Sequence, residues 1–98
     1  MIIETEAVQF KADQKLIEFI DKKFSKLNTF FDKITSVQVY LKLENSGQVR
    51  DKIVEAVVNV PGDKIFVKDS SKTFEESVEK VGSSLKRQLV KYKEKKRA

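Results

Sequence analysis

The sequence contains no cysteine, no histidine and no tryptophan. Without cysteine, the chain forms no disulfide and offers no thiolate to a metal ion. Without histidine, it lacks the most common general base, the most common metal ligand and the usual switch of charge near neutral pH. We therefore expect a protein that is not an enzyme and that needs no metal and no cofactor.

Glycine and proline are also scarce, with three glycines and one proline in 98 residues. Gly47, Gly62 and Gly82 are too far apart to build a glycine-rich loop that cradles phosphate. No apolar run approaches the ~20 residues that span a bilayer, and the N-terminus lacks the pattern of a signal peptide. These two absences favour a cytoplasmic protein. A chain of this length builds a single modest core, so the sequence predicts one domain.

Basic residues, by contrast, are concentrated at the C-terminal end of the chain. The segment Lys86–Ala98 carries seven basic side chains and one acid, Glu94. Its net charge of +6 exceeds the +5 of the whole chain, so residues 1–85 sum to −1. A pI near 9.4 favours an acidic partner, with nucleic acid first and an anionic membrane second.

The first half of the chain shows strand and helix periods in turn. Residues 2–9 predict a strand, and Asp13 is placed to cap a helix that runs to about Phe31. Residues 37–44 then alternate between apolar and polar side chains, as a half-buried strand does. Residues 45–47, Asn-Ser-Gly, predict a turn after that strand.

The second half predicts a hairpin followed by a long helix. Residues 50–60 are rich in β-branched side chains, and Pro61–Gly62 suits a type II turn into a short strand at 64–68. Thr73 begins a capping box for the last helix, whose apolar stripe ends near Tyr92. The order strand–helix–strand–strand–strand–helix predicts an α+β fold. We expect a four-stranded mixed sheet with its first two strands parallel and both helices side by side on one face.

Each predicted helix has one flank that carries basic side chains and no acid. The flank of the last helix consists of Lys80, Ser84, Arg87, Lys91 and Lys95. The flank of the first helix consists of Lys15, Phe19, Lys22 and Lys26, with Lys23 beside it. We predict that the two flanks meet across the groove between the helices and form a continuous cationic strip for phosphates.

Ordinary surface chemistry explains part of this pattern. Basic residues enrich the last turns of helices, and acidic residues the first turns, because they complement the helix macrodipole. Acid-free flanks on two separate helices favour a nucleic-acid surface. We interpret Phe19 as a core residue at the helix edge, and Tyr40 and Phe66 as a cross-strand packing pair on the far face of the sheet.

Four segments together resemble a known family. They are 23–27 (KFSKL), 30–34 (FFDKI), 37–44 (VQVYLKLE) and 85–93 (LKRQLVKYK). In order and spacing they are similar to the bacterial ribosome hibernation promoting factors, a family also called ribosome-associated inhibitor A or sigma-54 modulation protein. The chain resembles the short form, which implies a single ribosome-binding domain over residues 1–98 and no C-terminal dimerisation domain.

The resemblance implies a β-α-β-β-β-α fold and binding to the small ribosomal subunit and its rRNA, in the channel of mRNA and tRNAs. Occupying that channel inhibits translation in stationary phase or stress, and short members can promote inactive ribosome dimers. The implied partner is neither a membrane nor a small-molecule substrate, and the chain is expected to be a monomer off the ribosome. The resemblance carries over as rRNA contacts Lys23, Lys26, Lys33, Arg87, Lys91, Lys93 and Lys95.

The helix flanks, the basic C-terminal segment and the resemblance together give one predicted binding surface. Its residues are Lys22, Lys23, Lys26, Lys33, Lys80, Lys86, Arg87, Lys91, Lys93 and Lys95. Two departures from the family pattern lie in the last helix. Ser84 replaces a common lysine, and Glu75 and Glu76 put acid at the start of that helix.

Other functions fit the same charges. A generic module for structured RNA would bind free hairpins as well as ribosomes. A protein-binding transcription regulator, as the sigma-54 name suggests, would bind its partner with little dependence on salt. Anionic-membrane association through the last helix is a weaker interpretation, because the apolar face of that helix is committed to the core.

Overall fold

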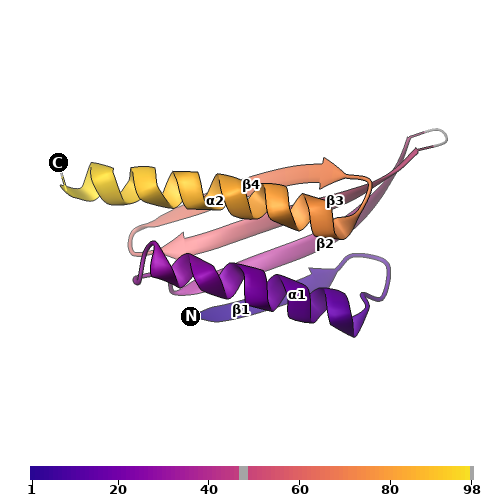
Figure 1. Cartoon of the computed structure of the whole chain (residues 1–98), viewed down its shortest axis with the longest axis horizontal. Coiled ribbons are helices and arrows are strands. Elements are labelled where there is room, and N and C mark those ends of the chain that lie inside the picture. The colour runs from indigo at the N-terminus through magenta and orange to yellow at the C-terminus, as the bar shows by residue number, and fades with distance from the viewer. Residues whose placement is uncertain (47–48, 98) are drawn as a thin grey trace.

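The computed structural model describes residues 1–46 and 49–97 as a four-stranded sheet with two helices on one face (Figure 1). The elements in chain order are β1 (Ile2–Ala7), α1 (Gln14–Ser25), the 3₁₀ helix η1 (Lys26–Thr29), β2 (Ser36–Ser46), β3 (Val49–Val60), β4 (Asp63–Ser71) and α2 (Phe74–Arg97). The strands lie in the order β1-β2-β3-β4, with β1 parallel to β2 and the other pairs antiparallel. The predicted fold class, topology and helix placement are confirmed.

Both helices begin at the residues that the sequence predicts. Asp13 Oδ1 accepts from the backbone N–H of Lys15 at 3.3 Å, and Thr73 Oγ1 accepts from that of Glu76 at 3.1 Å. Each cap satisfies one backbone donor that the first helical turn leaves without an intrahelical partner. The capping box is only half made, because the Glu76 carboxylate accepts from the hydroxyl of Ser71 instead of reaching back to Thr73.

Several element ends differ from the prediction. The first helix is α-helical only to Ser25 and continues as η1, where Thr29 Oγ1 donates to the carbonyl of Lys26 at 2.7 Å. Such side-chain bonds to the backbone compete with regular α-helical pairing. β4 continues to Ser71, beyond the predicted 64–68, because its polar last residues pair with β3 despite their low strand propensity.

The two hairpins compare differently with their predictions. Pro61–Gly62 joins paired residues Val60 and Asp63, and the φ of +78° at Gly62 fits the third position of the predicted type II turn. In the other hairpin, β2 runs through Ser46, so the predicted turn begins too early. The Gly47 of that turn lies outside the described residues.

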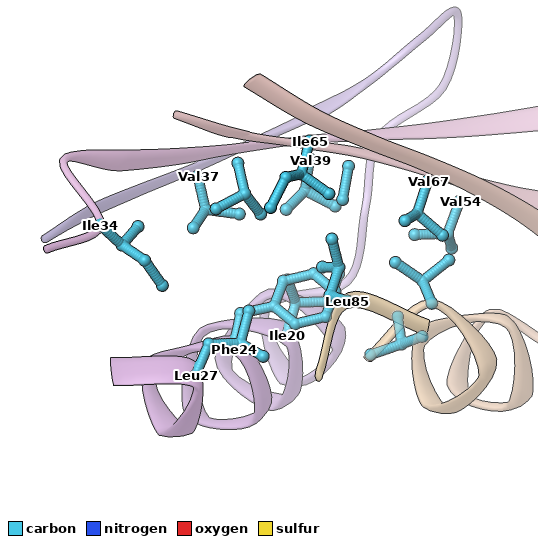
Figure 2. Close-up of a cluster of buried hydrophobic side chains, with 14 of the residues drawn as sticks. Ile20, Phe24, Leu27, Ile34, Val37, Val39, Val54, Ile65, Val67 and Leu85 are labelled. Carbon is cyan, nitrogen blue, oxygen red and sulfur yellow. The ribbon is translucent and has the colours of Figure 1, made fainter. Parts of the chain in front are cut away.

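The core lies between the inner face of the sheet and the two helices (Figure 2). Both helices contribute a stripe of buried apolar side chains with steps of three and four residues. These are Leu16, Ile20, Phe24 and Leu27 from α1 and η1, and Phe74, Val78, Val81, Leu85 and Leu89 from α2. Burial of each large side chain contributes roughly 1.5–3 kcal/mol, so this layer holds the helices in register with the sheet. Phe19 packs against the core as predicted.

One polar side chain, Ser77, is fully buried beneath α2. Its hydroxyl donates to the carbonyl of Lys52 in β3 at 2.6 Å and also lies 3.1 Å from the carbonyl of Thr73. The bond to β3 satisfies the buried hydroxyl and ties the first turn of α2 to an inner strand of the sheet.

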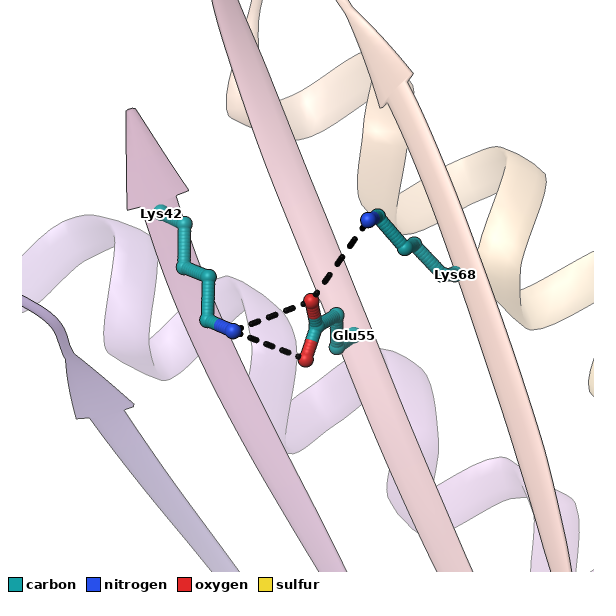
Figure 3. A network of polar contacts seen from close by, with 3 residues as sticks. All are labelled: Lys42, Glu55 and Lys68. Carbon is teal, nitrogen blue, oxygen red and sulfur yellow. Dashed lines mark hydrogen bonds and ion pairs between the residues drawn. The ribbon is translucent and has the colours of Figure 1, made fainter. Parts of the chain in front are cut away.

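The outer face of the sheet carries both apolar and charged side chains. Glu55 in β3 accepts from Lys42 Nζ at 3.1 Å and lies 4.0 Å from Lys68 Nζ, so one carboxylate links β2, β3 and β4 (Figure 3). The predicted packing pair on this face is wrong. Tyr40 pairs across β2–β3 with Glu55, whereas Phe66 pairs with Val57, so β3 lies between the two aromatic rings.

The C-terminal half of α2 is anchored through Tyr92, where the predicted core stripe ends. The Tyr92 ring meets the Phe31 ring edge-on at 5.3 Å, and its hydroxyl donates to the Pro61 carbonyl at 2.8 Å. Beyond Tyr92, α2 extends past the β3–β4 turn to Arg97 (Figure 1).

Candidate nucleic-acid interface

The relative direction of the two helices decides which flanks face each other. β1 and β4 run in the same direction, because β1 is parallel to β2 and two antiparallel pairings lead from β2 to β4. Each helix returns along the strand before it, so α1 and α2 are parallel neighbours (Figure 1). Two parallel helices on one sheet face have the same rotational sense, and they therefore turn opposite flanks toward each other.

The prediction that the two acid-free flanks meet across the interhelical groove is consequently wrong. The flank of α2 with Lys80, Arg87 and Lys91 faces β4, and Lys80 Nζ donates to the carbonyl of Ser70 in that strand at 3.2 Å. The side of α2 that faces α1 carries both an acid, Glu79, and a base, Lys86. It places Glu79 2.8 Å from Lys23 of α1.

An interhelical groove nevertheless carries three lysines. One side of the groove is lined by Lys23 of α1, by Lys26 and Leu27 of η1, and by Phe30, which follows η1. From α2 it is lined by Glu79, Gly82, Ser83 and Lys86. The ammonium of Lys86 lies over the Phe30 ring, 4.7 Å from the ring centroid. At such partly exposed sites an ion pair or a cation–π contact is worth only about 0.5–1 kcal/mol, so Lys23 and Lys86 can turn toward a phosphate at small cost.

A second hollow, the α2 groove, lies along the solvent side of α2 and reaches β4. Its basic side chains are Lys80, Lys86, Arg87 and Lys91. Its short side chains are Ser83, Ser84 and Val90, and its acids are Asp69 and Glu79. A guanidinium N–H of Arg87 donates to Ser84 Oγ at 3.1 Å, which draws the guanidinium toward the groove.

Lys86 lines both grooves and joins them into one surface, which we call the basic strip. The strip contains Lys23, Lys26, Lys80, Lys86, Arg87 and Lys91. Six cations against the two acids Asp69 and Glu79 make it a surface suited to a polyanion. The sequence predicts a strip between two facing flanks, whereas the basic strip in the structure passes over α2.

The other predicted binding residues lie outside both grooves. Lys22 on α1 and Lys33 after η1 are exposed. Lys93 and Lys95 are exposed on the last turns of α2, on the part that extends beyond the sheet.

Sequence reasoning missed several residues of the two grooves, among them Phe30, Val90, Asp69 and Glu79. Phe30 and Val90 were absent from the predicted surface because apolar residues are first assigned to the core. Asp69 and Glu79 were absent because their carboxylates repel phosphate. Val90 carries the one signal available in the sequence, since it falls off the apolar stripe of α2. It is 39% exposed.

Two absences apply to the described part of the chain. Among residues 1–46 and 49–97, no three acidic side chains gather closely enough to hold a metal ion. None of the helices in those ranges combines the length and the apolar character needed to cross a membrane.

Comparison with known proteins identifies the family. A family model described as "Sigma 54 modulation protein / S30EA ribosomal protein" matches residues 3–97. The chain belongs to this family. The predicted family resemblance is therefore confirmed, and the family is one of ribosome-associated proteins, not a known enzyme family.

Relatives in this family are named ribosome hibernation promoting factor. The one from Pseudomonas putida is 33% identical over 82 residues, which cover 84% of this chain and 76% of the relative. The one from Escherichia coli K12 is also 33% identical over 82 residues, which cover 84% of this chain and 82% of the relative.

Solved structures agree with the fold. A ribosomal subunit interface protein from Coxiella burnetii superposes with a TM-score of 0.83 at 26% identity, covering 95% of this chain and 98% of that chain. The N-terminal domain of Protein Y from Thermus thermophilus superposes with a TM-score of 0.69 at 14% identity, covering 93% and 94%. The second likeness concerns the fold alone.

Proposed function

We propose that this chain is a ribosome hibernation factor that binds rRNA of the small ribosomal subunit in the channel of mRNA and tRNAs. Bound there, it inhibits translation in stationary phase or stress and favours inactive ribosome dimers. The family of the chain supports this proposal. The structural observation that carries it is the basic strip, which crosses both helices and is continuous at Lys86.

Affinity comes mainly from neutralised phosphates. Each lysine acts as a point charge on a flexible stem, whereas Arg87 presents a planar fork that matches two phosphate oxygens. Release of the counterions around the rRNA then drives association. Folded rRNA presents phosphates at fixed positions, so a rigid pair of helices recognises shape more than base sequence.

Inhibition is steric and needs no chemical step. The folded chain measures 48 × 25 × 19 Å. A rigid body of that size in the channel excludes mRNA and tRNA while it stays bound. In this proposal the chain is a monomer off the ribosome and acts in the cytoplasm, where its target is.

The test replaces two cations of the strip. Arg87→Glu together with Lys91→Glu reverses charge at exposed positions on α2, so we expect the fold to remain and binding to small subunits to be lost. The matched control is Lys11→Glu with Lys64→Glu, which makes the same change in net charge at exposed positions outside the strip. Co-sedimentation with small subunits measures binding, and inhibition of cell-free translation measures function.

Three results would contradict the proposal. Unchanged co-sedimentation of the Arg87/Lys91 variant removes the strip as the binding surface. Equal binding to free RNA hairpins and to small subunits favours a generic RNA-binding module. An affinity that does not change with salt concentration favours a protein partner.

A further inference from the structure

The α2 groove combines features that phosphate binding alone does not need. Its floor is made by side chains shorter than their neighbours, Ser83, Ser84 and Val90. The longer side chains of Lys80, Lys86, Arg87 and Lys91 line the groove from neighbouring positions of α2. Val90 is one of the few large apolar side chains of the described residues that are exposed, and it lies among the cations of the strip.

Two carboxylates also line this groove. Asp69 reaches it from β4, and Glu79 from the first half of α2. Glu79 is paired with Lys23 at 2.8 Å, while Asp69 Oδ1 accepts from the backbone N–H of Ser70 at 2.9 Å. A carboxylate accepts several hydrogen bonds, so Asp69 retains capacity toward a ligand. Carboxylates repel phosphates, but they accept well from the N–H edges of nucleobases.

One ligand matches the floor, the acids and the cations together. A nucleotide unit offers an apolar ring face to Val90, a π-face to the guanidinium of Arg87 and an anionic phosphate to the lysines. A protein partner would need a wider apolar patch than a single valine. The surplus of cations over acids in the groove also favours an anionic ligand.

We propose that the α2 groove binds one unstacked nucleobase of the bound RNA, with Val90 against the ring face and Asp69 accepting from the exocyclic amino group of the base. The inference rests on the proposed function, because the RNA supplies the base. Adenine, cytosine and guanine carry an exocyclic amino group and uracil does not, so Asp69 favours the first three.

The test uses the full chain and RNA hexamers at low salt. The probes are a cytidine hexamer, a uridine hexamer and an abasic ribose-phosphate hexamer with the same number of phosphates. Wild type binds the cytidine hexamer at least fivefold more tightly than the abasic one. Val90→Ser removes the apolar contact without changing charge, so cytidine binding falls about fivefold while abasic binding is unchanged. Val90→Leu keeps an apolar contact and serves as the matched control.

A second variant tests the hydrogen bond between Asp69 and the base. Asp69→Asn removes a negative charge, so it strengthens binding of the abasic hexamer while it lowers the ratio of cytidine to uridine affinity. Far-UV circular dichroism checks that every variant is folded. Equal binding of cytidine and abasic hexamers by wild type overturns the inference. The inference is also overturned if Val90→Ser binds the cytidine hexamer as tightly as wild type, or if it weakens binding of the cytidine and abasic hexamers equally.

The two proposals fail in different ways. Suppose that the Arg87/Lys91 variant loses binding to small subunits while Val90→Ser binds them as tightly as wild type. These two results together overturn the base site and leave the proposed function standing. A wild-type chain that binds neither small subunits nor any hexamer overturns both proposals.

Discussion

At the scale of single residues, two glycines have opposite conformational roles. Gly62 has a φ of +78°, and a Cβ at this position meets no atom within 4 Å, so only the backbone conformation requires glycine there. Gly82 lies inside α2, where a Cβ would lie 3.8 Å from Phe24 Cε1, an ordinary van der Waals distance. The first site needs glycine, whereas the second tolerates alanine.

We therefore expect Gly62→Ala and Gly82→Ala to change stability in opposite directions. Gly62→Ala forces an L side chain into left-handed backbone and lowers the free energy of unfolding by about 1 kcal/mol. Gly82→Ala raises it by about 0.5–1 kcal/mol, because alanine is the better helix former and its methyl adds contact with Phe24. Urea denaturation of both variants measures the two changes, and a loss of stability in Gly82→Ala contradicts this account of the interhelical contact.

At the scale of elements, α2 is held along its length by different means. Its first turn is tied to β3 through Ser77, and its middle is buried through residues such as Leu85. Its last described contact with the body of the protein is at Tyr92, against Phe31 and the Pro61 carbonyl. The C-terminal turns with Lys93 and Lys95 depend on that contact for their position.

Tyr92→Phe tests this anchor. The ring contact with Phe31 is kept, while the 2.8 Å hydrogen bond to the Pro61 carbonyl is lost, so we expect global stability to fall by about 1 kcal/mol. Amide hydrogen exchange should quicken mainly in the turns beyond Tyr92, since residues 93–95 are exposed and α2 extends there past the β3–β4 turn (Figure 1). Exchange that quickens equally throughout α2 would show that the helix opens as one unit and that Tyr92 is no local anchor.

At the scale of the whole molecule, the side of the sheet with the helices carries the basic strip, while the opposite face is crossed by the Lys42–Glu55–Lys68 network. The charge of the strip predicts the salt dependence of ribosome binding. Six engaged cations correspond to a slope of log affinity against log salt of roughly −4 to −5.5.

Lys86→Gln should weaken binding and make that slope shallower by about 1, because one phosphate contact is lost at the junction of the two grooves. Lys11→Gln, which removes an exposed cation outside the strip, should leave the slope unchanged. Both slopes come from small-subunit binding measured between 50 and 200 mM salt, a range in which phosphate contacts dominate the change. Identical slopes for Lys86→Gln and wild type would remove Lys86 from the interface.

The sequence by itself determined the elements, their order and the fold class, because helix and strand periods and the caps at Asp13 and Thr73 are local properties. Helical phase also predicted the acid-free flank of α2 with Lys80, Arg87 and Lys91, since phase within one helix needs no knowledge of neighbours. The continuation of β4 to Ser71 was out of reach, because pairing with β3 outweighs local propensity there.

Only the tertiary structure decided which side chains share a surface. The parallel direction of α1 and α2 turns the Arg87 flank toward β4 and the Lys86 side toward α1, and helical phase within one helix carries no information about its neighbour. Strand order likewise separates Tyr40 in β2 from Phe66 in β4, because β3 lies between them. Contacts between distant segments depend on the packing of the whole core, so the basic strip and the groove at Val90 emerge only once the chain is folded.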